Sequence, residues 1–272
     1  MSLSREDIAF VDDLVLKAGK KLMEYYGIKD LKIREKSKNN PVTLADFAAN
    51  EVLIKGLMQR FPNDSILSEE ESQKMAGGIH KGENHRLWIL DPLDGTKEFI
   101  EKNPQFTVSV GFISSGEPML GWLYNPAQDI FYSGGIEIGF FKNGKKCTRK
   151  QQNKQDKPLL AISRTEAKKG YFDFILEEKD YPKPLQIGSI AWKLALLAAG
   201  EIDLVVSRKP KNLWDVAGAA ALLKTHSLLF MDKEFKPWVF NPDRPLISGV
   251  VAGTKEAIEQ LKELLAAKQV KL

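Results

Sequence analysis

The sequence predicts a mixed α/β chain (α+β), with a helical start, a β-rich middle and an alternating end. Apolar residues recur at helical spacing from Ile8 to Leu22. Short apolar runs separated by turn signals fill residues 106–147, which is typical of an antiparallel meander. Beyond residue 157, strand-like and helix-like segments alternate. These three observations together indicate stacked layers of helices and sheets.

Composition places the chain among ordinary globular proteins. Its 272 residues, 43% hydrophobic and 28% charged, suffice for one large core or for two halves sharing a cleft. A net charge of +4 suits an anionic ligand. Lys and Arg do not form blocks interleaved with aromatic residues, so we expect no nucleic-acid polymer as partner.

Cysteine usage and hydropathy indicate the cellular compartment of the protein. The single cysteine, Cys147, excludes an internal disulfide. It follows the turn signal at 143–144, so we expect it on an exposed strand and not as a catalytic thiol. No signal-peptide pattern opens the chain, and no apolar run reaches the roughly 18 residues of a membrane span. We therefore expect a cytoplasmic protein without a membrane partner.

The elements of the N-terminal half can be placed in order. A first helix follows a capping pair formed by Ser4 and Asp7, and a second begins near Thr43, which forms a similar pair with Asp46. A strand at 87–90 and a short helix at 97–101 come next.

The meander and the alternating end complete the chain. Strands are predicted at 106–113, 119–124 and 130–133. The polar stretch 150–157 divides an N-terminal α+β half, 1–150, from a C-terminal α/β half, 151–272. In the second half we expect the following elements: strands at 159–163, 204–207 and 249–252, and helices at 171–178, 190–199, 216–224 and 255–268.

Two aspartates, Asp91 and Asp94, directly follow the apolar run 88–90. The plain interpretation is a turn, because Asp and Gly are common turn residues. At the edge of a core, however, unpaired carboxylates repel one another and are costly to desolvate. A bound cation removes that cost, so metal ligation is favoured.

Two more acidic residues stand in comparable positions. Glu69 follows the apolar pair 66–67, although acidic runs are usually solvated. Asp215 opens a helix of small residues and, alone, is typical of a helix cap. Small residues would let that helix pack closely and bring Asp215 into a crowded site.

Hydroxyl groups offer a way to handle phosphate and water. Thr96 begins a short helix, where its hydroxyl and the N–H groups of Gly95 and Thr96 could hold a phosphate, unless Thr96 is simply a cap. Thr43 and Asp46 fit a capping box. That role leaves Asp46 able to pair with a threonine hydroxyl and polarise a water.

The sequence lacks the residue patterns of zinc sites, of phosphate-binding loops and of serine nucleophiles. His80, His85 and His226 lie in loop-like stretches without the spacing of a zinc site. Neither a phosphate-binding G-x-x-x-x-G-K-[ST] loop nor a G-x-S-x-G nucleophile elbow occurs.

Three segments in sequence order resemble the inositol monophosphatase superfamily. They are 67–70 (Leu-Ser-Glu-Glu), 91–96 (Asp-Pro-Leu-Asp-Gly-Thr) and 214–219 (Trp-Asp-Val-Ala-Gly-Ala). The resemblance implies a layered αβαβα sandwich and a lithium-sensitive, magnesium-dependent phosphomonoesterase. The segment 97–99 (Lys-Glu-Phe) is similar to the 3′(2′),5′-bisphosphate nucleotidase (CysQ-type) branch, whereas inositol monophosphatases more often carry Thr-Asn-Phe there.

Carried over residue by residue, the resemblance implies a site with two or three Mg²⁺ ions. Glu69, Asp91 and the Leu93 carbonyl would hold the first ion. Asp91, Asp94 and Asp215 would hold the second. A third ion near Glu69 would hold the nucleophilic water, and the catalytic set would be Asp46, Glu69 and Thr96. The implied phosphate- and substrate-binding residues are Gly95, Thr96, Ser163, Arg164 and Lys193.

One segment departs from the family pattern. After the third motif the family usually shows a Gly-Gly turn, whereas this chain has Lys-Thr-His-Ser at 224–227. The departure leaves open the edge of the C-terminal sheet and the substrate preference.

The predicted activity is hydrolysis of 3′-phosphoadenosine 5′-phosphate to AMP and phosphate. The alternatives are an inositol-1-monophosphatase or another sugar-phosphate phosphatase on the same fold, and a non-catalytic binding protein retaining the fold. Every acidic position needed for metal ions is occupied, which argues against a non-catalytic protein. We expect a small-molecule phosphomonoester substrate and a monomer or homodimer.

Overall fold

The structure is a computed structural model that describes residues 3–28, 33–37, 40–71, 79–80, 86–149, 157–178, 182–240 and 245–272. Its helices are α1 (Arg5–Met23), α2 (Leu44–Arg60), α3 (Thr96–Ile100), α4 (Arg164–Ala167), α5 (Asp173–Leu176), α6 (Ile190–Ala199), α7 (Leu213–Thr225) and α8 (Lys255–Lys268). The strands up to the middle of the chain are β1 (Ile33–Ser37), β2 (Asn40–Thr43), β3 (Ser65–Ser68), β4 (Ile79–His80), β5 (Arg86–Asp94), β6 (Thr107–Ser114), β7 (Glu117–Asn125), β8 (Ile130–Gly135), β9 (Gly139–Lys142) and β10 (Lys145–Cys147). The later strands are β11 (Leu160–Ser163), β12 (Leu185–Ile187), β13 (Leu204–Ser207), β14 (Lys211–Asn212), β15 (Leu229–Met231), β16 (Leu246–Ile247) and β17 (Val250–Gly253).

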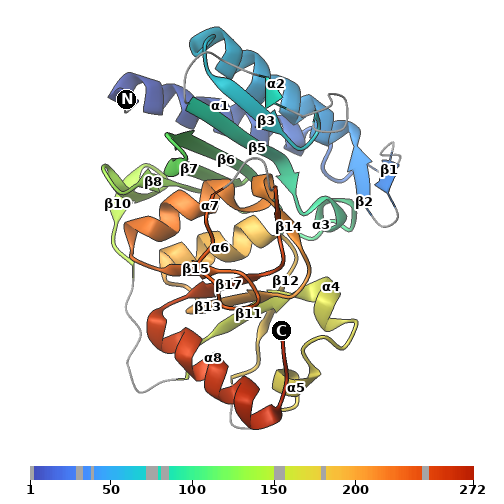
Figure 1. Cartoon of the computed structure of the whole chain (residues 1–272). Coiled ribbons are helices and arrows are strands. Elements are labelled where there is room, and N and C mark those ends of the chain that lie inside the picture. The colour runs from blue at the N-terminus through green and yellow to red at the C-terminus, as the bar shows by residue number, and fades with distance from the viewer. Residues whose placement is uncertain are drawn as a thin grey trace.

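Two large sheets alternate with three helical layers, which confirms the predicted αβαβα sandwich (Figure 1). Helices α1 and α2 cover the outer face of the first sheet, whose strand order is β10-β9-β8-β7-β6-β5-β3-β4. Helices α6 and α7 lie between this sheet and the second, ordered β12-β11-β13-β17-β15. Helix α8 covers the far face of the second sheet.

Alternating side chains of the first sheet feed two different cores. Trp88 and Leu90 of β5 pack with α1 and α2, whereas Ile89 between them packs with Leu213 and Ala217 of α7. This period of two is expected for a strand buried on both faces. Because β5 is covered on both sides, its end is held firmly where the pocket begins.

Strands β3 and β5 run parallel, so their ends reach the same edge of the sheet. Ser68 pairs with Leu90, and the Glu69 amide donates to the Leu90 carbonyl at 3.1 Å. Glu69 therefore lies beside Asp91, as a carboxylate cluster would require. The β5–β6 register is irregular between Asp91 and Asp94, so the strand bends there without ending at Leu90.

Helix α7 approaches the first sheet at backbone distance. A Cβ added at Gly218 would lie 2.8 Å from the Val110 carbonyl oxygen, and one added at Gly121 would overlap the Gly218 carbonyl. The predicted close packing of this small-residue helix is therefore confirmed. It carries Asp215, in the first turn of α7, to the same sheet edge as Asp91.

The atypical segment 224–227 still makes a turn. Helix α7 ends at Thr225, and Ser227 takes the left-handed conformation (φ 53°) that usually favours glycine. Strand β15 then pairs antiparallel with β17, so the edge of the second sheet forms without a Gly-Gly turn.

Two further sequence-based expectations concern the whole chain. The predicted boundary between the halves is 150–157, of which 150–156 lie outside the described residues, and the division into two halves stays a prediction. Within the described ranges, the structure contains no helix with the length and apolar character needed to span a membrane.

Candidate active site

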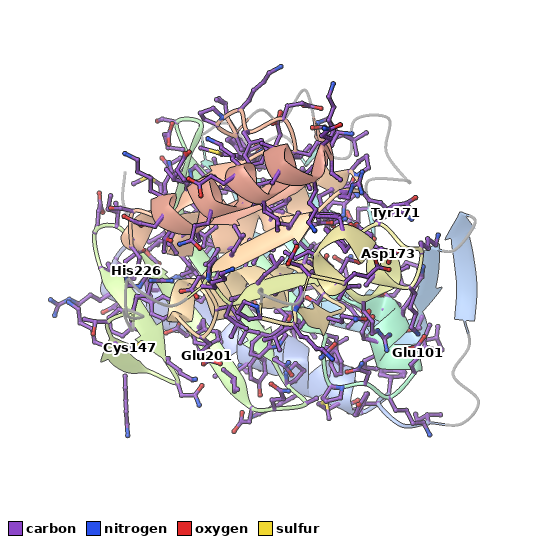
Figure 2. The ribbon with its side chains drawn as sticks, turned by 90° about the horizontal axis from the view of Figure 1, so that it is seen from below. Glu101, Cys147, Tyr171, Asp173, Glu201 and His226 are labelled. Carbon is purple, nitrogen blue, oxygen red and sulfur yellow. The ribbon has the colours of Figure 1, made fainter. Side chains whose placement is uncertain are left out.

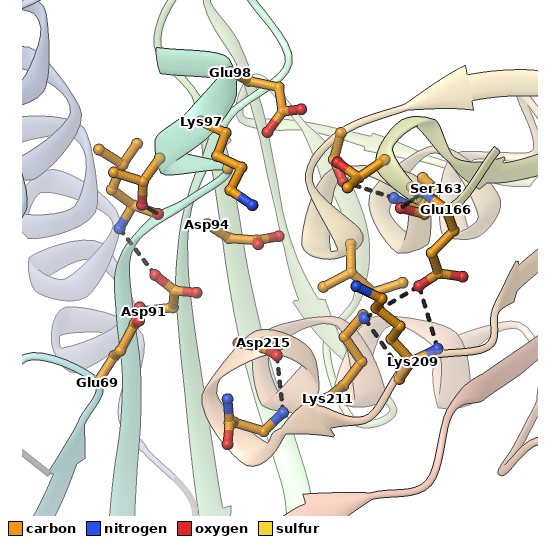
Figure 3. Close-up of a pocket in the computed structure, with 18 of the residues that line it drawn as sticks. Glu69, Asp91, Asp94, Lys97, Glu98, Ser163, Glu166, Lys209, Lys211 and Asp215 are labelled. Atoms are coloured by element: carbon orange, nitrogen blue, oxygen red, sulfur yellow. Dashed lines mark hydrogen bonds and ion pairs between the residues drawn. The ribbon is translucent and has the colours of Figure 1, made fainter. Parts of the chain in front are cut away.

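A pocket of about 440 Å³ opens where β5, α3, α4, α6 and α7 converge (Figure 3). Acidic side chains line one wall: Glu69, Asp91, Asp94 and Asp215. Lysines Lys209 and Lys211 approach from the opposite wall, beside Ser163 and Glu166. The structure thus brings four of the predicted metal ligands, and the Leu93 backbone, around one space.

Asp94 is held by the start of α6. Its Oδ2 accepts hydrogen bonds from the Ser189 hydroxyl at 2.5 Å and from the Ala191 amide at 2.6 Å. Burial raises the pKa of the Asp94 carboxyl, and these two hydrogen bonds oppose that rise. Asp94 therefore joins the N-terminal sheet to the C-terminal helix layer.

Asp91 and Asp215 are held by backbone amides near them in sequence. Asp91 Oδ1 accepts from the Leu93 amide at 3.0 Å, and Asp215 Oδ2 accepts from the Asn212 amide at 2.8 Å. Burial, reinforced by the charges of Asp94 and Glu69, raises the pKa of Asp215 to about 8. Asp215 therefore keeps its proton more readily than an exposed aspartate does, because burial and two neighbouring carboxylates disfavour its charged form.

This donor set fits hard divalent cations. Carboxylate and carbonyl oxygens are the ligands that Mg²⁺ prefers, and a cation offsets the repulsion that raises the Asp215 pKa. Within the described ranges, however, no three acidic, histidine or cysteine side chains stand close enough to enclose one ion. The carboxylates share a pocket but face amide and hydroxyl donors, so the ligand assignments stay predictions.

Thr96 and Asp46 are brought together as predicted. The Thr96 hydroxyl lies 3.3 Å from Asp46 Oδ1 and 3.2 Å from the Leu93 carbonyl oxygen. Asp46 Oδ2 accepts from the amide and the hydroxyl of Thr43, which completes the capping box of α2. One carboxylate therefore caps a helix and contacts the site, while Gly95, and not Thr96, occupies the cap position of α3.

Lys193 has a different environment from the one expected for a phosphate ligand. Its side chain is buried, and its Nζ donates to the carbonyls of Ile187, Gly188 and Ser189 at 2.9–3.0 Å. Burial lowers the pKa of Lys193 to about 8. These bonds hold the turn that carries Ser189. Lys193 also lines the pocket, so its predicted contact with phosphate stays a prediction.

Two residues of the segment 163–165 line the pocket, and the third points toward α3. Ser163 and Thr165 line the pocket, and the Ser163 hydroxyl also accepts from the Glu166 amide, capping α4. Arg164 instead donates to Glu98 at 2.8 Å and to Glu101 at 2.5 Å. Arg164 is thus paired with Glu98 and Glu101 in this structure, and its predicted contact with substrate stays a prediction.

Several residues of the pocket carried no sequence signal. Glu166 is 1% exposed, and its oxygens accept from the Ser207 hydroxyl at 2.8 Å, the Arg208 amide at 2.7 Å and the Lys209 amide at 3.2 Å. Glu166, Lys209 and Lys211 were missed in the sequence analysis, because no local pattern shows that a lone glutamate binds a segment 41–43 positions further along the chain. The Lys-Pro-Lys run at 209–211 is the one signal that was available.

Cys147 lies at the end of the molecule opposite Glu101 (Figure 2). Burial raises the pKa of its thiol, which lowers its reactivity at neutral pH. The prediction that this cysteine is not the nucleophile agrees with both findings.

Comparison with known proteins identifies the family. Residues 4–271 match the Inositol monophosphatase family. The chain belongs to this family. Its members are metal-dependent phosphomonoesterases, generally with Mg²⁺, and this chain is accordingly a phosphatase with a small-molecule phosphate substrate.

Curated relatives name two branches of the family. The "3′(2′),5′-bisphosphate nucleotidase CysQ" of Escherichia coli K12 is 35% identical over 236 residues, covering 85% of this chain and 93% of that protein. The protein of the same name from Haemophilus influenzae is 32% identical, covering 86% and 87%. "Inositol monophosphatase 3" of Solanum lycopersicum is 31% identical, covering 78% and 82%.

Solved structures support the fold. The suhB protein of Bartonella henselae superposes with a TM-score of 0.81 at 23% identity, covering 95% of this chain and 97% of that chain. The inositol monophosphatase of Thermotoga maritima gives 0.80 at 24% identity, covering 96% and 97%. At this identity, the likeness concerns the fold alone.

Proposed function

We propose that this phosphatase is a 3′(2′),5′-bisphosphate nucleotidase that converts 3′-phosphoadenosine 5′-phosphate to AMP and phosphate. The observation that carries the proposal is a pocket with an acidic wall and, facing it, a separate basic wall. Its volume of about 440 Å³ is in the range of sites for nucleotide-sized ligands. The CysQ relatives named above support the same assignment.

Glu69, Asp91, the Leu93 carbonyl, Asp94 and Asp215 would hold two Mg²⁺ ions, with a third near Glu69. Bound ions supply an activated water and neutralise the phosphate oxygens. Leu93 is suited to a part in this set, because its carbonyl already faces the Thr96 hydroxyl at 3.2 Å.

The chain's own residues would manage the proton of the attacking water. The Thr96 hydroxyl can accept that proton while donating its own to Asp46 Oδ1, 3.3 Å away. The water oxygen bonds to phosphorus as the bond from phosphorus to the ester oxygen breaks, and the leaving oxygen takes up a proton from solvent water. Asp46 is 1% exposed and doubly bonded to Thr43, so its geometry is fixed before substrate arrives. The amides of Gly95 and Thr96 would stabilise phosphate oxygens.

Glu98 belongs to the segment on which the branch resemblance rests, and its contacts can be described. This residue, part of the branch signature, lies against Gly188, where an added Cβ would overlap its carboxylate. Glu98 also pairs with Arg164 at 2.8 Å. The signature therefore shapes the junction between α3, α4 and the turn before α6, next to the pocket.

A substrate panel with purified protein and Mg²⁺ tests the proposal. We expect kcat/KM for 3′-phosphoadenosine 5′-phosphate to exceed that for inositol 1-phosphate and other sugar phosphates. A clear preference for inositol 1-phosphate would assign the chain to the other branch. Absence of phosphate release from every phosphomonoester would leave the non-catalytic alternative.

A further inference from the structure

A buried hydroxyl beside the acidic wall has no hydrogen-bond partner within the described part of the chain. Ser109, on β6, is 0% exposed, and its Oγ is neither donor nor acceptor to any described residue. Burying a polar group without a partner costs free energy, so such a group calls for a ligand, an ion or a water. Neither the proposed metal ligands nor the proposed proton path includes Ser109.

The register of the first sheet places Ser109 next to Asp91. The two residues are direct partners in the antiparallel ladder of β5 and β6. Such partners point to the same face of a sheet, with Cβ atoms roughly 4.5–5.5 Å apart. Ile89, two positions before Asp91 on β5, packs against α7. By the strand period of two, Asp91 and Ser109 share this α7 face.

Helix α7 meets Ser109 from the other side. A Cβ added at Gly218 would lie 2.8 Å from Ser109 Oγ. Gly218 stands three residues after Asp215, which is about one turn of the helix. Asp91 and Asp215 face the same pocket (Figure 3). The Ser109 hydroxyl therefore lies between the strand pair that carries Asp91 and the helix that carries Asp215.

This position suits a hydroxyl that serves a metal-bound carboxylate. In this structure Asp91 Oδ1 accepts from the Leu93 amide, on its own strand, at 3.0 Å. A cation shared by Asp91 and Asp215 would draw the Asp91 carboxylate toward α7, the side on which Ser109 lies. Carboxylates that bind metals are themselves hydrogen-bonded by outer partners, which orient them and strengthen metal binding.

We propose that Ser109 is a positioning residue for the cation site, and that its hydroxyl donates to the Asp91 carboxylate when a divalent cation is bound. The inference rests on the part of the proposed function that makes Asp91 a metal ligand. The close approach of Gly218 requires only that the residue at 109 be small, and alanine meets that requirement. Only the donor role requires a hydroxyl, so alanine separates the two.

The test measures cation binding without any substrate. Wild type, Ser109→Ala and a control, Ser133→Ala, are melted in EDTA and over a series of Mg²⁺ concentrations. Ser133 is a buried serine of the same sheet, on β8, which β6 and β7 separate from β5. We expect Ser109→Ala to need about 10–100-fold more Mg²⁺ than wild type for the same rise in Tm. Ser133→Ala should need the wild-type concentration.

The metal-free measurement shows whether Ser109 matters for packing alone. In EDTA, Ser109→Ala should melt no lower than wild type, because the hydroxyl that it removes has no partner there. An unchanged Mg²⁺ requirement in Ser109→Ala would overturn the positioning role, and so would an equal change in Ser133→Ala. Both results leave the nucleotidase assignment standing, since the substrate panel tests it separately. A wild type whose Tm does not rise with Mg²⁺ would overturn the cation site itself.

Discussion

The two walls of the pocket are built in opposite ways. The acidic wall comes from the ends of two parallel strands and the first turn of a helix, elements fixed by buried cores on both sides. The basic wall comes from Lys209, on the loop after β13, and Lys211, in the two-residue strand β14, and the buried Glu166 binds the backbone of this segment. The comparison teaches that the residues proposed for the chemistry stand on regular structure, whereas the basic wall is held by a few polar contacts.

The largest effect is expected at the acidic wall. Asp94→Asn should lower kcat/KM by more than the ~10–100-fold typical of losing a partner outside the coordination shell, because a metal ligand is changed. In EDTA the variant should melt no lower than wild type, because burial disfavours the charged carboxylate and an amide of the same size is buried without charge.

Phosphate release and thermal melting check this prediction side by side. Asp13→Asn, on the exposed face of α1, is the matched control and should match wild type in both. An active Asp94→Asn enzyme would contradict the assignment of Asp94 as a metal ligand.

Glu166→Gln tests whether Glu166 holds the backbone of the basic wall in position. The variant loses charge-assisted bonds to Ser207, Arg208 and Lys209, so we expect a free energy of unfolding about 1–3 kcal/mol lower in urea titrations. Its preference for 3′-phosphoadenosine 5′-phosphate over inositol 1-phosphate should also fall, while the Mg²⁺ requirement stays. If stability drops without any change in that preference, the loop does not set selectivity.

The acidic wall should also respond to pH. Without metal, the Asp215 pKa of about 8 means that the folded state keeps a proton that the unfolded carboxyl loses near its ordinary value. The folded state binds more protons in this window, so metal-free stability should fall as pH rises toward 8.

Because Mg²⁺ competes with that proton, the melting-temperature increase that it causes should grow from about pH 6 to about pH 8. Thermal scans with Mg²⁺ and with EDTA at each pH measure the difference. In Asp215→Asn, the melting-temperature increase caused by Mg²⁺ should be the same at pH 6 and pH 8. A pH-independent Mg²⁺ effect in wild type would show that Asp215 does not meet the ion.

The smallest effect is expected far from both walls. Ser227 has a φ of 53°, which costs an L-residue about 1–2 kcal/mol, partly offset by the greater freedom of glycine when unfolded. Ser227→Gly should therefore stabilise by about 0.5–1 kcal/mol in urea titrations. The preference for 3′-phosphoadenosine 5′-phosphate over inositol 1-phosphate should not move; a shift would extend the selectivity determinants to the edge of the second sheet.

Sequence predicted the acidic wall better than the basic one for a physical reason. Asp91, Asp94 and Asp215 stand beside apolar runs, and a charge at the boundary of a core is visible in the chain itself. The pairing of Thr96 with Asp46 was also predictable, because a capping box fixes Asp46 locally. Layer order followed from the family resemblance.

The basic wall depends on contacts between residues distant in sequence. Glu166 reaches Arg208 across 42 positions, and Ser189 reaches Asp94 across 95. No local pattern encodes such pairs. The buried hydrogen bonds of Lys193 and the ion pair between Arg164 and Glu98 could not be predicted either, because the local sequence does not encode them.

The close contact between α7 and the first sheet limits the substitutions that the chain tolerates there. At Gly121 and Gly218 main chain meets main chain, so no side chain is present that could repack around a substitution. Asp215 sits three residues before Gly218 on the same helix. Loss-of-function substitutions should therefore arise at these two glycines, deep between layers, even though neither lines the pocket.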